Sequence, residues 1–551
     1  MASNLLPNCN KISDGNPCIH TLDMKETTIR KESKIRRCEI GSKVPHQSEK
    51  VIMVVGATGS GKTAVINFFV NYILGVEWSS NFRYQLVPDE CESKKKSQAD
   101  SQTEWITAYT FYPQCRQAIP YTLTIIDTPG FGDTRGIKRD KEITEQIRVF
   151  FSTPSDYGID QIDAIAFVAQ AALPRLTETQ KFIFDSVLSG FGKNIAENIF
   201  LFLTFADLQA PQILGSTEKA SLPYKCYFKF NNSALYAQKD LKKDNQEQNS
   251  SDTDDDDDND EEKFNQTIWK MGTKSFKKFF KELQNTSAKS ITLSAEVLEE
   301  RKRLETSVAG LSRLIRSRIV TLEKHRKEKE MLEQYKNEMV SNKNFTFIVH
   351  IEKTAKQDLI DDYAMVCHKC KFTCHYPCSP RWPKFTCSAM KFLAVVRGCG
   401  VCPMECSLSD HENVAFTYER ERVEKTMTYA DLLESYEGAL RAVLKTEELV
   451  KCIEEDVSTA EIKIEKYLEK VSESLKRLQE IALKPNPSAT IDYIDVLIQN
   501  EQSEGQKGWQ ERRKALLDLR QKAHIINKIS HTETKVDYKE LANPPAVFDE
   551  I

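Results

Sequence analysis

The sequence lacks any apolar run long enough to cross a membrane, because runs such as Val51–Val55 fall far short of the ~20 residues that a spanning helix needs. Its first residues lack a basic segment followed by an apolar one, so we expect no secretory signal peptide. An excess of charge of one sign is also absent, since the formal net charge is −4. This excludes a global electrostatic attraction to nucleic acid or to an anionic membrane. We therefore expect a soluble, cytoplasmic protein with no membrane span.

Cysteine, in contrast, is not scarce, with fifteen in the 551 residues. In a cytoplasmic chain thiols stay reduced, so we expect free thiols or metal ligands rather than disulfides. Eight of the cysteines fall between Cys367 and Cys406, which is a cluster. The length of the chain suggests three or four domains.

The apolar run 51–55 leads into a glycine-rich segment, Gly56-Ala57-Thr58-Gly59-Ser60-Gly61-Lys62-Thr63. Its spacing is that of the phosphate-binding P-loop, in which the glycines let successive backbone N–H groups face a diphosphate. The helix predicted over Ala64–Leu74 adds the positive end of its dipole. Lys62 is expected to reach the β and γ phosphates, and Thr63 to supply a hydroxyl to Mg²⁺. The sequence therefore predicts a nucleotide-binding site.

A second phosphate-site element, Asp127-x-x-Gly130, follows the strand predicted over Tyr121–Ile126. In this arrangement Asp127 holds Mg²⁺ through water, while the backbone N–H of Gly130 senses the γ-phosphate. The D-x-x-G spacing alone is common. Its position after a P-loop, at the end of a buried strand, makes it a strong indication of a phosphate site.

Base recognition is predicted in Thr204-Phe205-Ala206-Asp207, which follows the strand predicted over Ile199–Leu203. The carboxylate of Asp207 can accept two hydrogen bonds from the N1 and N2 donors of guanine. The usual lysine is replaced by Phe205, which offers a flat apolar cover without a charge. Asn232-Ser233-Ala234 stands where a backbone N–H reads guanine O6. That Asp207 is instead a helix N-cap remains an alternative.

The pattern from Glu49 to Leu283 alternates apolar strands with amphipathic stretches, which is typical of an open α/β sheet. We interpret residues 1–48 as a disordered arm, because they are polar and show no sustained period. The acidic run Asp252–Glu262 predicts a solvated, disordered insertion over residues 241–263. It lacks the glycine and the closing glutamate of an EF-hand loop.

Heptad-like apolar registers predict long helices or coiled coils over residues 295–342 and 414–484. Further helices and a tail are expected over residues 485–551. An antiparallel bundle within one chain and an intermolecular coiled coil both remain open. The predicted fold is thus α/β, with a mostly parallel P-loop sheet and flanking helices. An α-helical or coiled-coil half with a Cys-rich insertion follows it.

The Cys-rich insertion, residues 343–413, predicts one or two tetrahedral zinc sites, because two Cys-x-x-Cys pairs are separated by further ligands. The candidate ligands are Cys367, Cys370, Cys374, Cys378, Cys387, Cys399, Cys402, Cys406 and His411. The paired Cys367, Cys370, Cys399 and Cys402 are favoured. More ligands are present than two sites need, so the assignment stays open, and redox-active or buried thiols are the alternative. A structural zinc role is expected, because a ligand-rich site leaves no open position for water.

The nucleotide motifs together carry a family resemblance. The span from Glu49 to Leu283 resembles the septin-like and immunity-associated (GIMAP-type) GTPases of the translation-factor-related class. The carriers are Gly56–Thr63, Asp127-Thr128-Pro129-Gly130-Phe131-Gly132-Asp133 and Thr204–Asp207. The resemblance covers somewhat under half of the chain and implies an α/β domain that binds GTP or GDP with Mg²⁺.

The resemblance also implies switch loops around Ser97–Thr103 and Pro129–Gly136. Thr103 is the candidate switch threonine for Mg²⁺ and the γ-phosphate. Ser101 is its rival, and Thr103 is equally plausible as an ordinary strand-entry threonine.

Phe131 departs from the pattern of small GTPases, which place a water-orienting glutamine directly after D-x-x-G. A phenyl ring cannot orient water, so GTP hydrolysis is expected to be slow or to depend on a residue from a dimer partner, as family members suggest. The leading hypothesis is a GTP-dependent switch or assembly protein whose helical half engages partners or a second copy, with a homodimer formed through the GTPase domain or the coiled coil. The alternative is a non-hydrolysing, nucleotide-bound scaffold with a structural zinc module.

Overall fold

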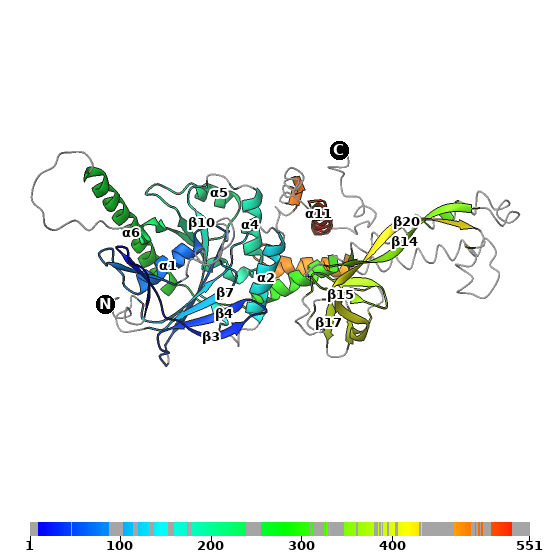
Figure 1. Cartoon of the computed structure of the whole chain (residues 1–551), viewed down its shortest axis with the longest axis horizontal. Coiled ribbons are helices and arrows are strands. Elements are labelled where there is room, and N and C mark those ends of the chain that lie inside the picture. The colour runs from blue at the N-terminus through cyan, green and yellow to red at the C-terminus, as the bar shows by residue number, and fades with distance from the viewer. Residues whose placement is uncertain are drawn as a thin grey trace, which may run out of the picture. The chain divides into compact units, whose positions relative to one another are not determined.

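The structure is a computed structural model, and the chain divides into two compact units. The first comprises Met1–Glu299 with Ile481–Tyr493, and the second Glu300–Glu480 with Ile494–Ile551 (Figure 1). The main described ranges are 9–45, 47–86, 103–113, 119–132, 137–152, 159–173, 178–237, 255–308, 346–359, 362–378, 406–428, 468–485 and 509–531, with shorter stretches and single positions between them.

The first unit is built on an eight-stranded sheet with the order β12-β11-β10-β5-β8-β7-β4-β3. Its strands are β3 (Lys25–Arg30), β4 (Ile35–Ile40), β5 (Glu49–Gly56), β7 (Ile106–Phe111), β8 (Thr122–Asp127), β10 (Ala164–Gln170), β11 (Ile199–Thr204) and β12 (Cys226–Lys229). The strands from β12 through β5 to β8 run parallel, as do β4 and β7, whereas β7–β8 and β3–β4 are antiparallel. This confirms the predicted α/β class with a mostly parallel sheet, compatible with a GTPase fold.

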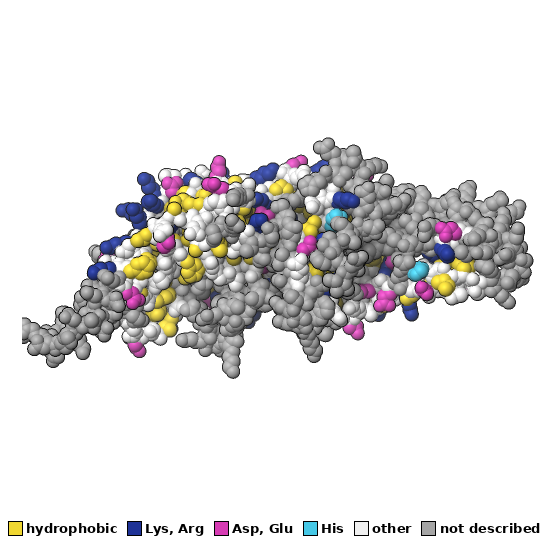
Figure 2. Space-filling view, turned by 90° about the horizontal axis from the view of Figure 1, so that it is seen from above, with side chains coloured by type: hydrophobic (Ala, Val, Ile, Leu, Met, Phe, Trp, Pro, Cys, Tyr) yellow, Lys and Arg dark blue, Asp and Glu magenta, His cyan; other side chains and the backbone are white. Residues whose placement is uncertain are grey.

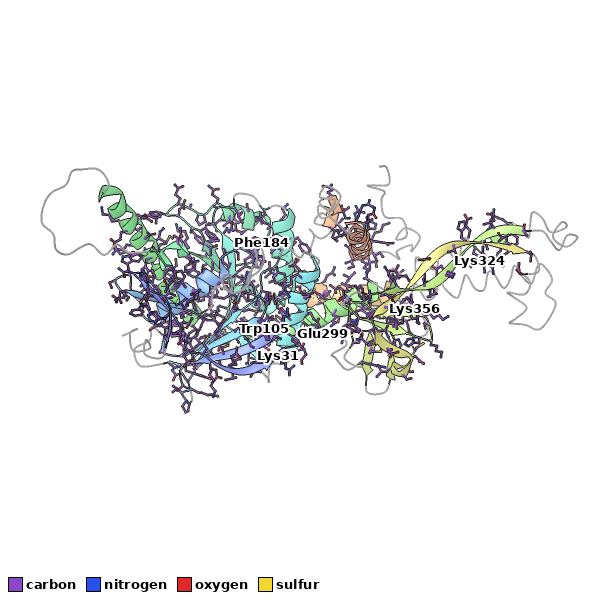
Figure 3. The ribbon with its side chains drawn as sticks, in the orientation of Figure 1. Lys31, Trp105, Phe184, Glu299, Lys324 and Lys356 are labelled. Carbon is purple, nitrogen blue, oxygen red and sulfur yellow. The ribbon has the colours of Figure 1, made fainter. Side chains whose placement is uncertain are left out.

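Helices cover both faces of this sheet, which is why its central strands are apolar along their whole length. They are α1 (Lys62–Ile73), α2 (Ile137–Ser152), α4 (Glu178–Ser189), α5 (Ile213–Lys219) and α6 (Asp255–Gln284). On the α1 and α6 side, Phe279 lies edge-on to Phe202 of β11, with ring centroids 5.0 Å apart. Facing α4, Phe167 of β10 meets Phe184, also at 5.0 Å (Figure 3). The helix predicted over Trp269–Leu283 lies within α6, with its aromatic face buried in the core.

Residues 9–45 correct the prediction of a disordered arm, because they form strands. Strands β3 and β4 extend the main sheet, and β1 (Asn10–Ser13) and β2 (Cys18–Thr21) form a smaller sheet with β6 (Phe82–Gln85). The backbone of β4 pairs with the edge of β7, while its Ile35, Cys38 and Ile40 are buried. Beside this edge, Arg36 stacks 5.7 Å from the ring of Trp105 (Figure 3). The apolar residues of β4 are too few to show a period, and pairing with an existing strand supplies the stabilisation that the pattern did not reveal.

The acidic segment also differs from its prediction, since α6 begins at Asp255 and residues 255–263 are therefore helical. Acidic residues at the start of a helix are favoured by its dipole, which offsets part of their mutual repulsion. Residues 241–254 lie outside the described part of the chain.

The first unit does not end at Leu283 as predicted. Residues Ile481–Tyr493 also belong to it. There the backbone N–H of Leu483 donates to the Phe191 carbonyl at 2.9 Å. Lys484 forms an ion pair with Asp185 of α4 at 3.6 Å. The predicted boundary missed this return because it depends on contacts far apart in sequence.

The second unit contains a long antiparallel ladder, in which β14 (Thr346–Asp358) pairs with β20 (Phe416–Thr428) over its full length. Lys356 lies over the ring of Phe416, 4.4 Å from its centroid (Figure 3). Strand β20 corrects the prediction that residues 414–484 form one long helix. Its Glu, Arg and Lys residues favour helices in isolation, but cross-strand pairs such as Arg420–Glu352 at 3.0 Å stabilise the ladder instead.

Helical residues are described at 292–308 and 468–481, and α11 spans Trp509–His531. Most of residues 312–342 and 432–467 of the two predicted long helices lie outside the described ranges. Among the described helices, none is both long and apolar enough to span a membrane. On the face seen in Figure 2, basic and acidic side chains are interspersed over the first unit.

A prediction follows from the burial of β4. Replacing Ile35 by Ala should lower the free energy of unfolding by about 2–5 kcal/mol, because it removes a fully buried side chain from the sheet. Urea denaturation of the full chain measures this change. The matched control is Ile29→Ala on β3, where the side chain is 46% exposed and the cost should stay below about 1 kcal/mol. Equal effects of the two substitutions would contradict a folded N-terminal edge.

Candidate functional site

The carboxyl ends of the parallel strands bring the predicted phosphate residues to one edge of the sheet. Asp127, the last residue of β8, lies opposite Val54 of β5, just before the P-loop. On the other side of β5, Gly56 lies opposite Val168 of β10. An open α/β sheet binds ligands at this edge, beyond the ends of its strands.

The backbone of the P-loop has the geometry of an anion-binding turn. Gly61 has the left-handed φ of 87°, and α1 begins directly after it without a side-chain cap. Within the described part of the chain, the N–H groups of Gly59, Gly61, Lys62 and Thr63 donate to no backbone carbonyl. Uncapped N–H groups at the positive end of a helix attract phosphate oxygens.

Lys62 and Asp127 are both buried beneath the P-loop, and the charge of each acts on the other. The Nζ of Lys62 donates to the carbonyls of Ala57 at 2.8 Å and Gly56 at 3.3 Å. Burial lowers the pKa of Lys62 and raises the pKa of Asp127, and the attraction between the two groups opposes both shifts. Both carboxylate oxygens of Asp127 lack a hydrogen-bond partner among the described residues, as do the hydroxyls of Thr58 and Ser60. Unpaired buried carboxylate and hydroxyl oxygens fit the oxygen donors that Mg²⁺ prefers.

The D-x-x-G segment lies directly against the P-loop. The N–H of Thr58 donates to the Phe131 carbonyl at 2.7 Å, and the N–H of Phe131 donates to the Gly56 carbonyl at 3.2 Å. A Cβ on Gly130 would lie only 2.7 Å from the Cα of Thr58, so this close approach requires glycine. The Phe131 side chain is buried, and no water-orienting group stands at its position. A change in the D-x-x-G segment therefore acts directly on the P-loop.

The predicted base-recognition residues also gather at one edge. Strands β11 and β12 are parallel neighbours, so the loops that follow them carry Asp207 and Ser233 beyond the same edge. Lys229 connects the first loop to β12, because its Nζ donates to the carbonyls of Asp207 at 3.1 Å and Gln209 at 2.8 Å. Phe205 is 58% exposed, as a cover for a planar base would be.

The two loops are shaped by local hydrogen bonds. The Asp207 carboxylate accepts from the N–H of Gln209 at 2.9 Å, which makes an Asx turn. Asp207 is not a helix N-cap, because Gln212 holds that position at the start of α5. Ser233 donates its N–H to the Asn231 side chain at 3.3 Å, while Ala234 is buried.

The hydroxyl of Thr204 contacts the P-loop. Its hydroxyl donates to the Ser60 carbonyl at 2.7 Å, with a longer contact to the Ala169 carbonyl at 3.2 Å. It therefore braces the P-loop. Gln170, which sequence reasoning missed, donates to the Gly59 carbonyl at 3.2 Å. Its only sequence signal is a polar residue at the end of an apolar strand.

Thr103 lies just before β7, which pairs antiparallel with β8 so that Thr107 is opposite Asp127. This register places Thr103 at the phosphate edge of the sheet. Its rival Ser101, the rest of the segment from Ser97, and residues 133–136 of the second switch loop lie outside the described ranges. A switch role for Thr103 stays a prediction.

The cysteines and histidines of the second unit form three groups of donor atoms, each with its atoms within 4.8 Å of one another. These are Cys367, Cys370, Cys402 and Cys406; Cys374, Cys399, Cys402 and His411; and His375, Cys378 and Cys387. The favoured set of two Cys-x-x-Cys pairs is thus split between two groups. His375 was not among the predicted ligands. All cysteines that the structure describes are free thiols.

Comparison with models of known protein families found no match, and no curated protein matches either. Among solved structures, the chain is similar to Toc33 from Arabidopsis thaliana in complex with Mg²⁺ and GMPPNP. The identity is 19%, 34% of this chain and 72% of that chain are covered, and the TM-score is 0.22. It is also similar to a GTP-binding protein from the archaeon Sulfolobus solfataricus in complex with GDP, at 16% identity over 33% of this chain and 47% of that chain, with a TM-score of 0.20. TM-scores this low carry no argument about function. The proposed function therefore rests on the geometry of the site alone.

The brace between Thr204 and the P-loop yields a prediction. Replacing Thr204 by Val removes the hydrogen bond to Ser60 and should weaken the binding of a magnesium–nucleoside diphosphate by about tenfold, the equivalent of one lost hydrogen bond. Isothermal titration measures the affinity. Thr217→Val is the control, because Thr217 is also buried and the substitution removes its hydrogen bond to the Leu214 carbonyl within α5, away from the P-loop. Unchanged affinity in the Thr204 variant would show that the brace is not needed.

Proposed function

We propose that the protein binds GTP or GDP with Mg²⁺ and acts as a nucleotide-controlled switch or assembly protein. One observation carries this proposal: the carboxylate of Asp127 is 1% exposed and unpaired among the described residues, at the edge of an uncapped P-loop. A buried carboxylate without a partner is costly unless a ligand satisfies it. A hydrated Mg²⁺ beneath a phosphate chain would do so.

Different residues of the chain bind the phosphates and the ion. The N–H groups at the start of α1 bind phosphate oxygens, and Lys62 leaves the loop carbonyls to pair with the β and γ phosphates. Thr63 and Asp127 hold the ion, which neutralises phosphate charge when bound. Gly130 lies against the P-loop and reports whether a γ-phosphate is present, because any movement of its segment disturbs the bonds of Phe131 to that loop.

Guanine is the base that the site favours. Asp207 offers a carboxylate at the edge where β11 and β12 end, and the loop of Ser233 and Ala234 lies beyond the same edge. A carboxylate accepts hydrogen bonds from the N1 and N2 donors of guanine, whereas adenine has no donor at either position. The exposed ring of Phe205 covers the base in place of the usual lysine.

Hydrolysis of GTP to GDP and phosphate is the proposed activity, and it is slow in the isolated chain. Phe131, the residue after D-x-x-G, is buried, and its phenyl ring cannot orient the attacking water molecule. A second copy of the chain, joined through the nucleotide-binding unit or the helical half, would have to supply the missing group. The helical half also engages protein partners in this proposal.

The burial of Phe131 also favours a second candidate, a scaffold that binds nucleotide without hydrolysing it. In this case the nucleotide stabilises the first unit, and the Cys/His groups bind structural zinc in the second. The two candidates differ in whether any phosphate is released.

Nucleotide affinities of two variants test the binding proposal. Lys62→Ala should weaken GDP binding by at least about 100-fold, because a charge-assisted contact to phosphate is lost. Asp207→Ala should weaken GDP binding more than IDP binding and so remove a preference for GDP over IDP of about tenfold or more, since inosine keeps the N1 donor but lacks the N2 donor. Both are measured by titration of the full chain with Mg²⁺ present.

The controls are Lys270→Ala on α6 and Glu218→Ala on α5, which remove exposed charges away from the site. Neither should change any affinity. Tight ADP binding by the wild type would rule out guanine selection, and full GDP affinity in the Lys62 variant would rule out the P-loop site.

Phosphate release at increasing protein concentration tests the choice between switch and scaffold. At low concentration we expect less than about 10⁻² s⁻¹ per chain, the range of GTPases that act without help from another protein. At concentrations that allow dimers the rate per chain should rise at least about tenfold, because a residue supplied in trans stabilises the transition state. No release at any concentration would favour the scaffold and contradict the switch.

A further inference from the structure

The Cys/His module holds more donors than two separate tetrahedral sites require. Its three groups together take up all eight clustered cysteines with His375 and His411, and only Cys402 belongs to two groups. Zinc in a structural site takes four ligands. The first two groups therefore each reach four donors only if the sulfur of Cys402 serves both.

The surroundings of Cys402 suit a thiolate between two ions. Its Sγ accepts a hydrogen bond from the N–H of Cys406 at 3.2 Å, and its own N–H donates to the Sγ of Cys399 at 3.3 Å. The Sγ of Cys367 likewise accepts from the N–H of Cys370 at 3.3 Å. Backbone N–H groups directed at sulfur stabilise the negative charge that a metal ligand must carry. Each of the two groups thus already contains a turn whose N–H groups face its sulfurs.

His411 supplies an independent indication of a metal. The ring is almost fully buried, and its Nδ1 lies 2.7 Å from the Ser407 carbonyl. A carbonyl accepts only from a protonated nitrogen, so in the neutral imidazole Nε2 keeps its lone pair, and Nε2 has no partner among the described residues. This carbonyl–histidine arrangement is the one that orients a metal-binding imidazole.

The sheet of the module connects the two groups. Strand β15 (Ala364–Cys367) pairs with β19 (His411–Val414), and Cys367 of the first group is directly opposite His411 of the second. The two groups are therefore adjacent by backbone register as well as through Cys402.

The third group has its own geometry. The Sγ of Cys387 lies 3.4 Å from Nδ1 of His375 and 3.7 Å from the Sγ of Cys378. Ligand atoms around one tetrahedral zinc ion are about 3.8 Å apart when the zinc–sulfur bonds are about 2.3 Å. These spacings therefore fit one ion with three protein ligands.

We propose that the module binds three zinc ions, two of which share the sulfur of Cys402 as a bridging thiolate. The first ion of the pair has Cys367, Cys370 and Cys406 as its other ligands, and the second has Cys374, Cys399 and His411. The third ion is separate. Every cysteine ligand releases its proton when the metal binds. This proposal is independent of the nucleotide site in the first unit.

Metal content and ¹¹³Cd NMR of the full chain test the proposal. The purified protein should contain three zinc ions per chain, one for each donor group. After replacement by ¹¹³Cd²⁺, two of three resonances should be split by each other, because scalar coupling passes through a shared sulfur. The third resonance should be unsplit. Unsplit resonances throughout, or two or fewer ions per chain, would overturn the proposal.

Three variants locate the bridge. Cys402→Ser should remove the splitting and at least one ion, whereas Cys387→Ser should lose one ion and leave the split pair intact. Cys226→Ser in β12, a free thiol outside the module, is the matched control and should keep all three ions and the splitting. Three retained ions in the Cys402 variant would overturn the bridge. If that variant fails to fold, the splitting in the wild type and in the Cys387 variant still decides.

Discussion

The structure of the first unit depends on a buried carboxylate, that of Asp127, whose oxygens have no hydrogen-bond partner among the described residues. Asp127 ends β8 beneath the P-loop, where the charge of Lys62 acts on it but the Nζ of that lysine donates to the loop carbonyls. A protein without ligand therefore bears an electrostatic cost at its centre. A ligand that binds only the folded state offsets this electrostatic cost and stabilises the whole sheet. Ligand binding and stability are thus coupled through one residue.

The contacts around that carboxylate are short and direct, which limits how the site can respond. Gly130 has no room for a side chain against Thr58, and Phe131 exchanges two backbone hydrogen bonds with the P-loop. Thr204 holds the loop from the opposite side. Because packed segments of this kind have few intermediate positions, a ligand shifts them between discrete arrangements.

Local patterns predicted the parts of the molecule that depend on local chemistry. The P-loop, the D-x-x-G element and the buried strands were identified because glycine spacing and apolar runs act over a few residues. Strand β4 was missed because its stability comes from pairing with β7, and β20 because pairing with β14 overrides the helix propensity of its charged residues. The role of Thr204 and the double membership of Cys402 depend on atoms brought together by the fold. The spacing of residues in the sequence cannot predict these two contacts.

The return of residues 481–485 to the first unit affects how the chain is made. A ribosome releases the P-loop, the sheet and α4 long before it releases Leu483 and Lys484, which complete the packing at Phe191 and Asp185. Domains generally begin to fold as they emerge, N-terminal segments first. The nascent first unit must therefore wait for residues 300–480 to be synthesised with one of its surfaces uncovered. If the first unit binds nucleotide as proposed, a nucleotide captured at this stage would stabilise the unfinished unit, since a ligand stabilises the folded state that binds it.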